Sequence, residues 1–254
     1  ERSSKEDFLI SKRGKIFAWF QRFSDAIVCN SHNAKIMWEK HYPKYSDKLS
    51  VIYNPVLLPE ITSEYQIKRE GKLHIIVAAS YQYLKNPIGV IKALALMSKE
   101  ERAMVHIDWY GRKEVTLGNT AAYDEAVKLI EVNNLIEVIS LNDPTHDIAN
   151  KMNEADAVAL FSELEGLPNA ICEGMMIGKP IIMTKVSDYN TLVDVRNGVL
   201  CDWDNPVSIK DAILSIAKLN NKGLIEMGNQ SKQKADGLFS AETIIKNWIE
   251  LIKS

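Results

Sequence analysis

Short, nearly continuous hydrophobic runs alternate with longer stretches of mixed polarity from about residue 73 onward. Within each run the apolar residues follow one another instead of alternating with polar ones. This pattern is typical of strands that are covered on both faces, as in a parallel sheet. The runs that we predict to be strands are residues 73–79, 105–110, 136–140, 157–161, 180–184 and 198–201.

The stretches between these runs have the pattern of helices that bury one face. Asn86-Pro87 and Asn205-Pro206 each place a capping side chain before a proline, and Gly178 is suited to end a helix. The alternation predicts an α/β fold with a doubly wound, parallel, Rossmann-like sheet. The predicted helices are residues 87–97, 121–133, 146–153, 169–177 and 206–219.

The first 54 residues do not follow this pattern. They predict a strand at residues 24–30, a helix at 32–41 and a strand at 48–53. Three such elements are too few to form a core of their own. We therefore interpret residues 1–54 as the end of a preceding α/β domain.

Residues 55–72 contain two prolines and a polar stretch, and we interpret them as a linker. Residues 73–254 form the predicted α/β domain, with a final helix at 241–253 that could pack on either part. Because the sequence begins at Glu1 without a methionine, we expect the chain to be a piece of a longer protein.

Composition narrows the function classes. The chain has 31 basic and 33 acidic residues, a net charge of −2, so we expect no nucleic-acid partner. The chain has three cysteines, an odd number, and each lies beside apolar residues: Cys29, Cys172 and Cys201. They indicate free thiols in a reducing compartment, the cytoplasm, rather than a disulfide framework. No apolar run approaches the roughly 20 residues of a membrane span.

Several nucleotide and metal motifs are missing. No Gly-x-Gly-x-x-Gly follows a predicted strand, no Walker motif occurs, and the five histidines show neither zinc nor triad spacing. Asp202-Trp203-Asp204 matches a cation motif of some sugar transferases, but it directly precedes Asn205-Pro206, so a turn and helix cap explains it better. We therefore expect no metal site and no resident cofactor.

The segment from Glu165 to Asn169 lies between a predicted strand and a predicted helix, where parallel α/β sheets bind ligands. Free N–H groups at such a helix start attract phosphate oxygens, and Gly166 allows the backbone to approach a ligand closely. Glu165 and Glu173 are eight residues apart and could each accept two hydroxyl hydrogen bonds, as a sugar or ribose would offer. The alternative is a capping role for Glu165 and a solvated position for Glu173.

Two basic residues follow other predicted strands. Lys85, just before a helix, is a suitable counter-charge for a diphosphate, although most surface lysines only confer solubility. Arg112 follows Gly111 and could reach a phosphate, but a plain solvent role explains it better.

The stretch E-G-L-P-N-A-I-C-E-G-M-M-I-G-K-P closely resembles the E-x7-E signature of retaining family 4 glycosyltransferases. Those enzymes have the GT-B architecture, in which two Rossmann-like domains face each other across a cleft. Near the start, F-S-D-A-I-V-C-N-S-H is similar to the last strand of their N-terminal domain. The resemblance covers nearly the whole chain. It implies that residues 1–54 are a remnant of the N-terminal acceptor domain and that residues 73–254 bind the nucleotide sugar.

The resemblance also implies roles for the candidate residues. Glu173 would bind the ribose hydroxyls, Glu165 would contact the donor sugar, and Lys85 would neutralise the diphosphate leaving group. The base would lie after the third predicted strand. The turn that would offer backbone N–H groups is Gly166, Leu167, Pro168 and Asn169, and the residues near the base would be Ser140 and Leu141.

Three features depart from the family pattern, and one of them is Ala79, where the family usually has a glycine. The usual arginine five residues before the lysine is Ser80 here, so that phosphate counter-charge is missing or comes from elsewhere. The usual Gly-Gly-x-Pro-Glu loop reads Val-Ser-Asp-Tyr-Asn at residues 186–190.

The implied function is transfer of a sugar, with retention, from a nucleotide-diphosphate donor to a sugar or lipid-linked acceptor in surface polysaccharide or glycoconjugate synthesis. A UDP-sugar is favoured over a GDP-sugar. The preceding domain would bind the acceptor, and the full-length enzyme could associate peripherally with a membrane. We expect this chain alone to bind the donor weakly and to show no turnover. Two alternatives are a GT-B-like sugar-nucleotide epimerase and a non-catalytic nucleotide-binding or interaction domain, which Ser80 favours.

Overall fold

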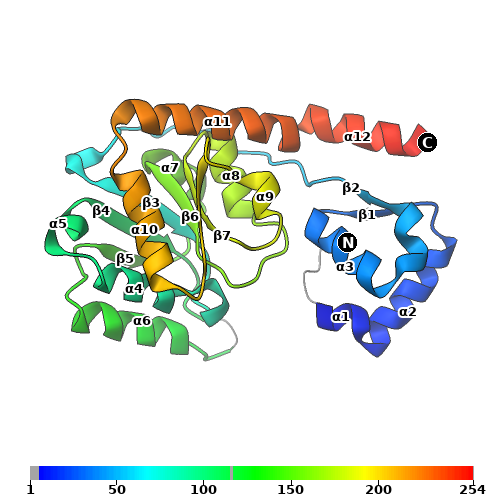
Figure 1. Cartoon of the computed structure of the whole chain (residues 1–254), viewed down its shortest axis with the longest axis horizontal. Helices are drawn as coiled ribbons and strands as arrows, with labels where there is room; N and C mark the ends of the chain where they lie inside the picture. The colour runs from blue at the N-terminus through cyan, green and yellow to red at the C-terminus, as the bar shows by residue number, and fades with distance from the viewer. Residues whose placement is uncertain (1–5, 115–116, 254) are drawn as a thin grey trace.

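The computed structural model describes residues 6–114 and 117–253. Residues 1–5, 115–116 and 254, which belong to the predicted ranges 1–54 and 73–254, lie outside the described part. A large α/β domain (residues 73–239) and a smaller N-terminal segment (residues 6–54) lie side by side, joined by an extended stretch and overlain by the C-terminal helix (Figure 1).

The large domain is built on one sheet in which every neighbouring pair of strands is parallel. The first strand of this domain lies in the middle of the sheet. The next two strands in the sequence lie on one side of it, and the following ones lie on the other side (Figure 1). This order confirms the predicted doubly wound, Rossmann-like fold. In spatial order the strands are β5 (Ile139–Asn142), β4 (Val105–Tyr110), β3 (Leu73–Ala78), β6 (Ala157–Leu160), β7 (Ile181–Thr184) and β8 (Gly198–Cys201).

Side chains from both faces of the sheet are buried. In β3, Leu73, Ile75 and Val77 join one hydrophobic cluster, whereas Ile76 joins the other. Burying one such side chain is worth about 1.5–3 kcal/mol, so these two clusters are the main source of stability. The first face is covered by α4 (Pro87–Ala95), α6 (Ala121–Val132) and α10 (Pro206–Ala217), and the second by α7 (Ile148–Glu154), α8 (Asn169–Ile177) and α11 (Asn221–Phe239).

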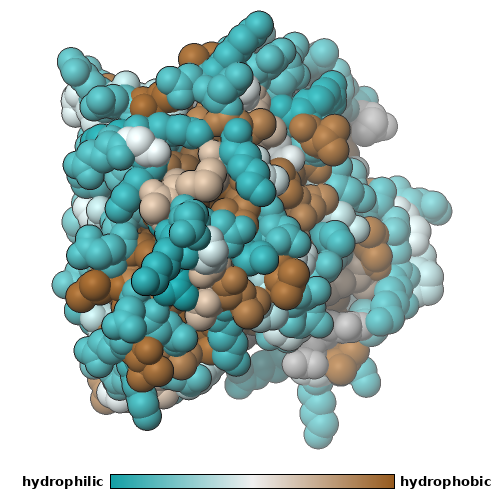
Figure 2. All heavy atoms as spheres, turned by 60° about the vertical axis from the view of Figure 1, so that its left-hand side comes forward, coloured by the Kyte–Doolittle hydropathy of each residue, from teal (hydrophilic) through white to brown (hydrophobic). Residues whose placement is uncertain are grey.

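The predicted helix caps agree with the structure, although several helix ends differ from the predicted ones by one or two residues. The Asn86 side chain accepts a hydrogen bond from the Gly89 N–H, and the Asn205 side chain caps α10. Gly178 ends α8 in the left-handed region, with φ of 89°. The side of the domain that carries α4, α6 and the short α5 (Lys99–Ala103) faces the viewer in Figure 2, where hydrophilic side chains surround smaller hydrophobic groups.

The predicted linker runs along the large domain and is tied to it by a buried carboxylate. Asp156 is fully buried and accepts hydrogen bonds from the Tyr65 hydroxyl, the Lys68 N–H and the His74 N–H, at 2.8–2.9 Å. The Lys179 ammonium lies 3.4 Å from the centre of the Tyr65 ring. Residues 55–72 are therefore held in place although they contain almost no regular secondary structure.

The N-terminal segment has more structure than we predicted. Two helices precede the expected elements, and together they bury their own cluster, which includes Leu9, Ala18 and Trp38. The prediction of no separate core is wrong because it did not include these helices. The elements are α1 (Glu6–Ile10), α2 (Lys12–Phe20), β1 (Ile27–Cys29), α3 (His32–His41) and β2 (Leu49–Val51), with β1 and β2 paired in parallel.

The C-terminal helix α12 (Ala241–Lys253) contacts both parts. Ile244 is buried in the cluster on the second face of the large domain. Near the other end of the helix, Trp248 and Ile252 line a hollow together with Val28 and Ser50 of the N-terminal segment. The helix therefore bridges the two parts of the chain (Figure 1).

Candidate functional site

The loops after the strands meet at the carboxyl edge of the sheet. Because all six strands are parallel, residues 79–86, 161–168, 185–188 and 202–205 all lie at this edge. Open α/β sheets bind their ligands here, next to the N-termini of the helices that follow. Every predicted site residue except Ser140, Leu141 and Glu173 belongs to a loop at this edge or to its immediate boundary.

Lys85 and Glu165 contact each other. The Lys85 Nζ lies 2.6 Å from the Glu165 Oε1, and the two side chains are only 20% and 13% exposed. The Ser162 hydroxyl donates a second hydrogen bond to the same oxygen, also at 2.6 Å. The Glu163 N–H donates to the Leu84 carbonyl at 2.9 Å, which joins the backbones of the two loops. The structure thus brings together two residues that are 80 positions apart in the sequence.

The turn after Glu165 leads directly into α8. The helix begins at Asn169, after Pro168, and no side chain caps its N-terminus. Its first backbone N–H groups can therefore serve a ligand, and the helix dipole adds positive potential there. The Ser187 hydroxyl donates a hydrogen bond to the Gly166 carbonyl, which fixes the turn from the neighbouring loop.

Glu173 lies in the second turn of α8. Together with Leu167, Asn169 and the segment 54–57 it lines an open hollow of about 420 Å³. Burial raises the pKa of the Glu173 carboxyl above its ordinary value. Among the contacts of the described residues none joins Glu173 directly to the Lys85–Glu165 pair, and the turn 165–169 forms the connection between them.

Ser80 and Arg112 lie on loops at the same edge of the sheet but are engaged differently. The Ser80 hydroxyl accepts a hydrogen bond from the Gln82 side-chain amide at 2.8 Å. Arg112 is exposed, and its carbonyl accepts a hydrogen bond from the Tyr81 N–H at 2.9 Å. The loop after β3 therefore holds itself together with polar contacts, and Lys85 is the residue of this loop that reaches the Glu165 carboxylate.

Ser140 and Leu141 do not follow the third strand, as we predicted, but lie inside it. The strand β5 begins three residues later than expected, because residues 136–138 form a turn closed by the Val138 N–H and the Leu135 carbonyl. The Ser140 hydroxyl contacts the His106 ring at 3.2 Å, and Leu141 packs against the first hydrophobic cluster.

Asp188 and Ser187 were not predicted as site residues. Asp188 is 2% exposed, and its carboxylate binds the start of α3 and the Tyr53 hydroxyl. These partners lie 135 or more positions away in the sequence. The only local signal was the departure of residues 186–190 from the family pattern.

The Asp202-Trp203-Asp204 segment forms a turn, as expected. The Asn205 N–H donates to the Asp202 carbonyl, and the Asp202 side chain pairs with Lys185 at 2.8 Å. Within the part of the chain that the structure describes, no cluster of three or more histidine, cysteine or acidic side chains is arranged to hold a metal ion.

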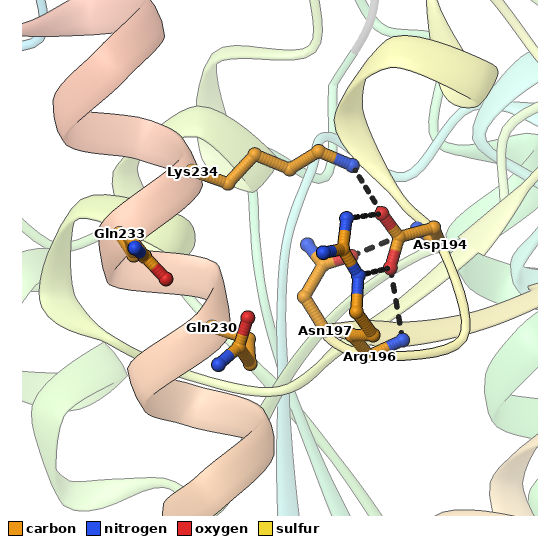
Figure 3. Close-up of a pocket in the computed structure, with 6 residues that line it drawn as sticks. All are labelled: Asp194, Arg196, Asn197, Gln230, Gln233 and Lys234. Atoms are coloured by element: carbon orange, nitrogen blue, oxygen red, sulfur yellow. Dashed lines mark hydrogen bonds and ion pairs between the residues drawn. The ribbon is translucent and has the colours of Figure 1, made fainter.

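A second polar pocket lies at the opposite, amino edge of the sheet, before β8. Figure 3 shows Asp194 between Arg196 and Lys234, with ion-pair distances of 2.9 and 3.0 Å. The hydrogen bonds from Arg196 and Lys234 lower the pKa of the Asp194 carboxyl well below its ordinary value. The charges of this pocket are thus paired with one another, and it fastens α11 to the loop before β8.

No helix among residues 6–114 and 117–253 is both long and apolar enough to cross a membrane.

The comparisons with known proteins identify the family of the chain. The family model for Glycosyl transferases group 1 matches residues 72–218. An uncharacterised glycosyltransferase of Haemophilus influenzae is 25% identical over 234 residues, which cover 88% of this chain and 60% of that protein. The Vi polysaccharide biosynthesis protein of Salmonella typhi is 22% identical over 230 residues, which cover 85% of this chain and 39% of that protein. The chain thus spans only part of each relative.

The fold matches that of a solved structure. The crystal structure of Anabaena HepE in complex with UDP and glucose superimposes with a TM-score of 0.83 at 18% identity, covering 100% of this chain and 70% of that one. The residues matched by the family model include the whole six-stranded sheet, Lys85 and both glutamates of the E-x7-E motif. The chain therefore belongs to the Glycosyl transferases group 1 family.

Proposed function

We propose that this chain is the donor-binding part of a glycosyltransferase that moves a sugar from a nucleotide diphosphate to an acceptor with retention. The observation that carries the proposal is the arrangement of the turn 165–169. This turn places the Lys85–Glu165 pair and the uncapped start of α8 at one edge of the sheet, with Glu173 in the adjoining hollow.

Each group has a chemical task in this proposal. Breaking a sugar–phosphate bond builds negative charge on the diphosphate and positive charge on the sugar carbon. Lys85 and the N–H groups at the start of α8 stabilise the first charge. Glu165 accepts hydrogen bonds from the sugar hydroxyls, and Glu173 accepts them from the ribose. Neither carboxylate has to act as a nucleophile, so transfer can occur on the face from which the nucleotide leaves.

The donor and the pathway are proposed from the relatives. The Anabaena protein is described in complex with UDP and glucose, which supports a UDP-sugar donor for this chain over a GDP-sugar. The Salmonella relative is named for polysaccharide biosynthesis, which supports a surface polysaccharide or glycoconjugate as the product. Ser140 and Leu141 lie in β5, which β4 separates from β3 and the proposed phosphate site, and the base would be held there.

The acceptor is proposed to bind on the side of the N-terminal segment, as a sugar or a lipid-linked sugar at a membrane surface. We expect the 254 residues alone to bind a nucleotide without turnover. Cys29, Cys172 and Cys201 are buried and form no disulfide with one another, which supports a cytoplasmic location.

Nucleotide titration tests the proposal. UDP and GDP are titrated by calorimetry into the chain, into Glu173→Gln and Lys85→Ala, and into the control Glu163→Gln, an exposed glutamate in the same loop. We expect UDP to bind more tightly than GDP. Each site variant should lose roughly tenfold or more in affinity, because a charge-assisted hydrogen bond is worth about 1.5–3 kcal/mol.

The control variant should bind UDP as the native chain does. Equal UDP affinity in all four proteins, or none in the native chain, would contradict the donor-site assignment. The first of these results would favour a non-catalytic module. Such a module is the second candidate, because position 80 carries a serine that contacts Gln82 in place of a cation. Retention itself is tested in the full-length enzyme by the anomeric configuration of the product, measured by NMR.

A further inference from the structure

A single buried carboxylate receives three hydrogen bonds from the N-terminal segment. The Asp188 Oδ2 accepts from the His32 N–H at 2.6 Å and from the Tyr53 hydroxyl at 2.7 Å, and its Oδ1 accepts from the Asn33 N–H at 2.7 Å. Asp188 itself belongs to the large domain, in the loop between β7 and α9 (Tyr189–Leu192). A buried charge is tolerated when it is fully hydrogen-bonded, and these three donors meet that condition.

The contact with Asp188 satisfies backbone N–H groups at the start of α3. Ser31 caps the helix by accepting a hydrogen bond from the Ala34 N–H, which leaves the first two N–H groups of α3 without a partner in their own segment. Those two groups, of His32 and Asn33, are the ones that Asp188 binds. The negative charge also lies at the positive end of the helix dipole, which strengthens the contact.

Ser187, the residue before Asp188, contacts the loop between β6 and α8 (residues 161–168), which we call the donor loop because it is proposed to bind the donor sugar. Ser187 has a φ of 53°, in the left-handed region, although it is not a glycine. Its hydroxyl donates a hydrogen bond to the Gly166 carbonyl, one residue after Glu165. A non-glycine residue keeps such a conformation when surrounding contacts enforce it. Here two adjacent residues make the enforcing contacts: Ser187 binds the Gly166 carbonyl, and Asp188 binds the start of α3.

We propose that Asp188 is a positioning residue that couples the N-terminal segment to the donor loop: its carboxylate fixes the start of α3, and Ser187 passes that position to Gly166 and Glu165. The consequence for catalysis rests on the proposed function, because it assigns Glu165 to the donor sugar. A segment that moves relative to the large domain would then move the donor loop with it. A hollow of about 400 Å³, lined by His32, Ile36 and residues 187–191, adjoins this contact.

Amide hydrogen exchange measured by mass spectrometry tests the coupling, and it needs neither substrate nor activity. Asp188→Asn keeps the size of the side chain but turns one acceptor into a donor that faces N–H or O–H groups. We expect the amides of residues 32–34 and those of residues 165–167 to exchange roughly tenfold faster or more in this variant. Ser187→Ala removes only the second link, so it should speed exchange at 165–167 and leave 32–34 unchanged.

Asp211→Asn is the matched control, because Asp211 is an exposed carboxylate on α10 and should change neither segment. Faster exchange at 32–34 alone in Asp188→Asn would overturn the proposal and reduce Asp188 to a helix cap. If Asp188→Asn does not fold, Tyr53→Phe removes one of the three donors and should raise exchange in both segments by a smaller factor; no change at 165–167 would again overturn the coupling.

UDP titration of the native chain separates the two proposals. If Asp188→Asn speeds exchange in both segments but the native chain does not bind UDP, the positioning role stands and the donor-site assignment fails. If the native chain binds UDP but exchange at 165–167 does not change, the donor-site assignment stands and the positioning role fails.

Discussion

Lys85 pairs with Glu165 in the structure, so under the proposed function a diphosphate would compete with Glu165 for the same cation. This competition predicts opposite effects for two substitutions that each remove one charge. Lys85→Met should weaken UDP binding, because the phosphates lose their counter-charge. Glu165→Gln should leave UDP affinity unchanged or raise it, because UDP lacks the transferred sugar that Glu165 is proposed to contact.

The structure sets the size of both effects. With an effective dielectric constant of about 20, unit charges 2.6 Å apart attract each other by about 6 kcal/mol, and desolvation offsets most of this. A net charge-assisted hydrogen bond of about 1.5–3 kcal/mol makes Lys85→Met roughly 10- to 100-fold weaker. A partly exposed pair is worth about 1 kcal/mol, so Glu165→Gln should gain up to about fivefold.

Isothermal titration with UDP at low ionic strength measures both variants, the double variant and a control. The control is Lys185→Met, because Lys185 pairs with Asp202 at the same edge of the sheet but is about half exposed. It should change UDP affinity by less than about twofold. The double variant should behave like Lys85→Met. A tenfold loss in Glu165→Gln would refute the competition and make Glu165 a direct nucleotide ligand.

Three further predictions concern stability. Gly174→Ala should lower the free energy of unfolding in urea by about 1–2 kcal/mol, because its Cβ would lie 2.7 Å from the Val158 Cβ; the loss should shrink in a Val158→Ala background. Asn205→Ala removes the cap of α10 and should lower urea stability by about 1 kcal/mol. Burial lowers the pKa of Lys179 from 10.5 to about 8. Between these pH values unfolding takes up a proton, so the free energy of unfolding should rise with pH. The difference in urea midpoint between the native chain and Lys179→Met should show this rise.

The sequence predicted those elements whose signals are local. Asn86 and Asn205 mark helix starts through contacts within three residues, and buried apolar runs mark the strands. The longest helix of the large domain, α11, escaped prediction because it is polar and contains three glycines. At least one of these glycines is required by tertiary packing. A Cβ at Gly228 would lie 2.2 Å from the Gly178 carbonyl oxygen, so the glycine permits α11 to cross the end of α8 closely.

The candidate site was predictable as a set of loops but not as a set of contacts. The strand–turn–helix pattern placed residues 165–169 at the carboxyl edge, and the Rossmann-like order brought Lys85 to the same edge. Nothing local indicated that Lys85 would bind Glu165, that Ser162 would share that oxygen, or that Asp188 would bind α3. These contacts join segments that only the folded sheet brings together.

The Lys85–Glu165 pair also constrains how the proposed site can work. If Lys85 were unpaired, its partly buried ammonium would cost some free energy, and under the proposed function Glu165 would face the phosphates as an uncompensated anion. The pair removes both costs, since each charge compensates the other until the diphosphate binds. Under the proposed function, Glu165 would keep the Ser162 hydrogen bond when Lys85 binds the phosphates, and it could then accept sugar hydroxyls. Release of the nucleotide would restore the pair, so the contact that opposes nucleotide binding would also favour product release.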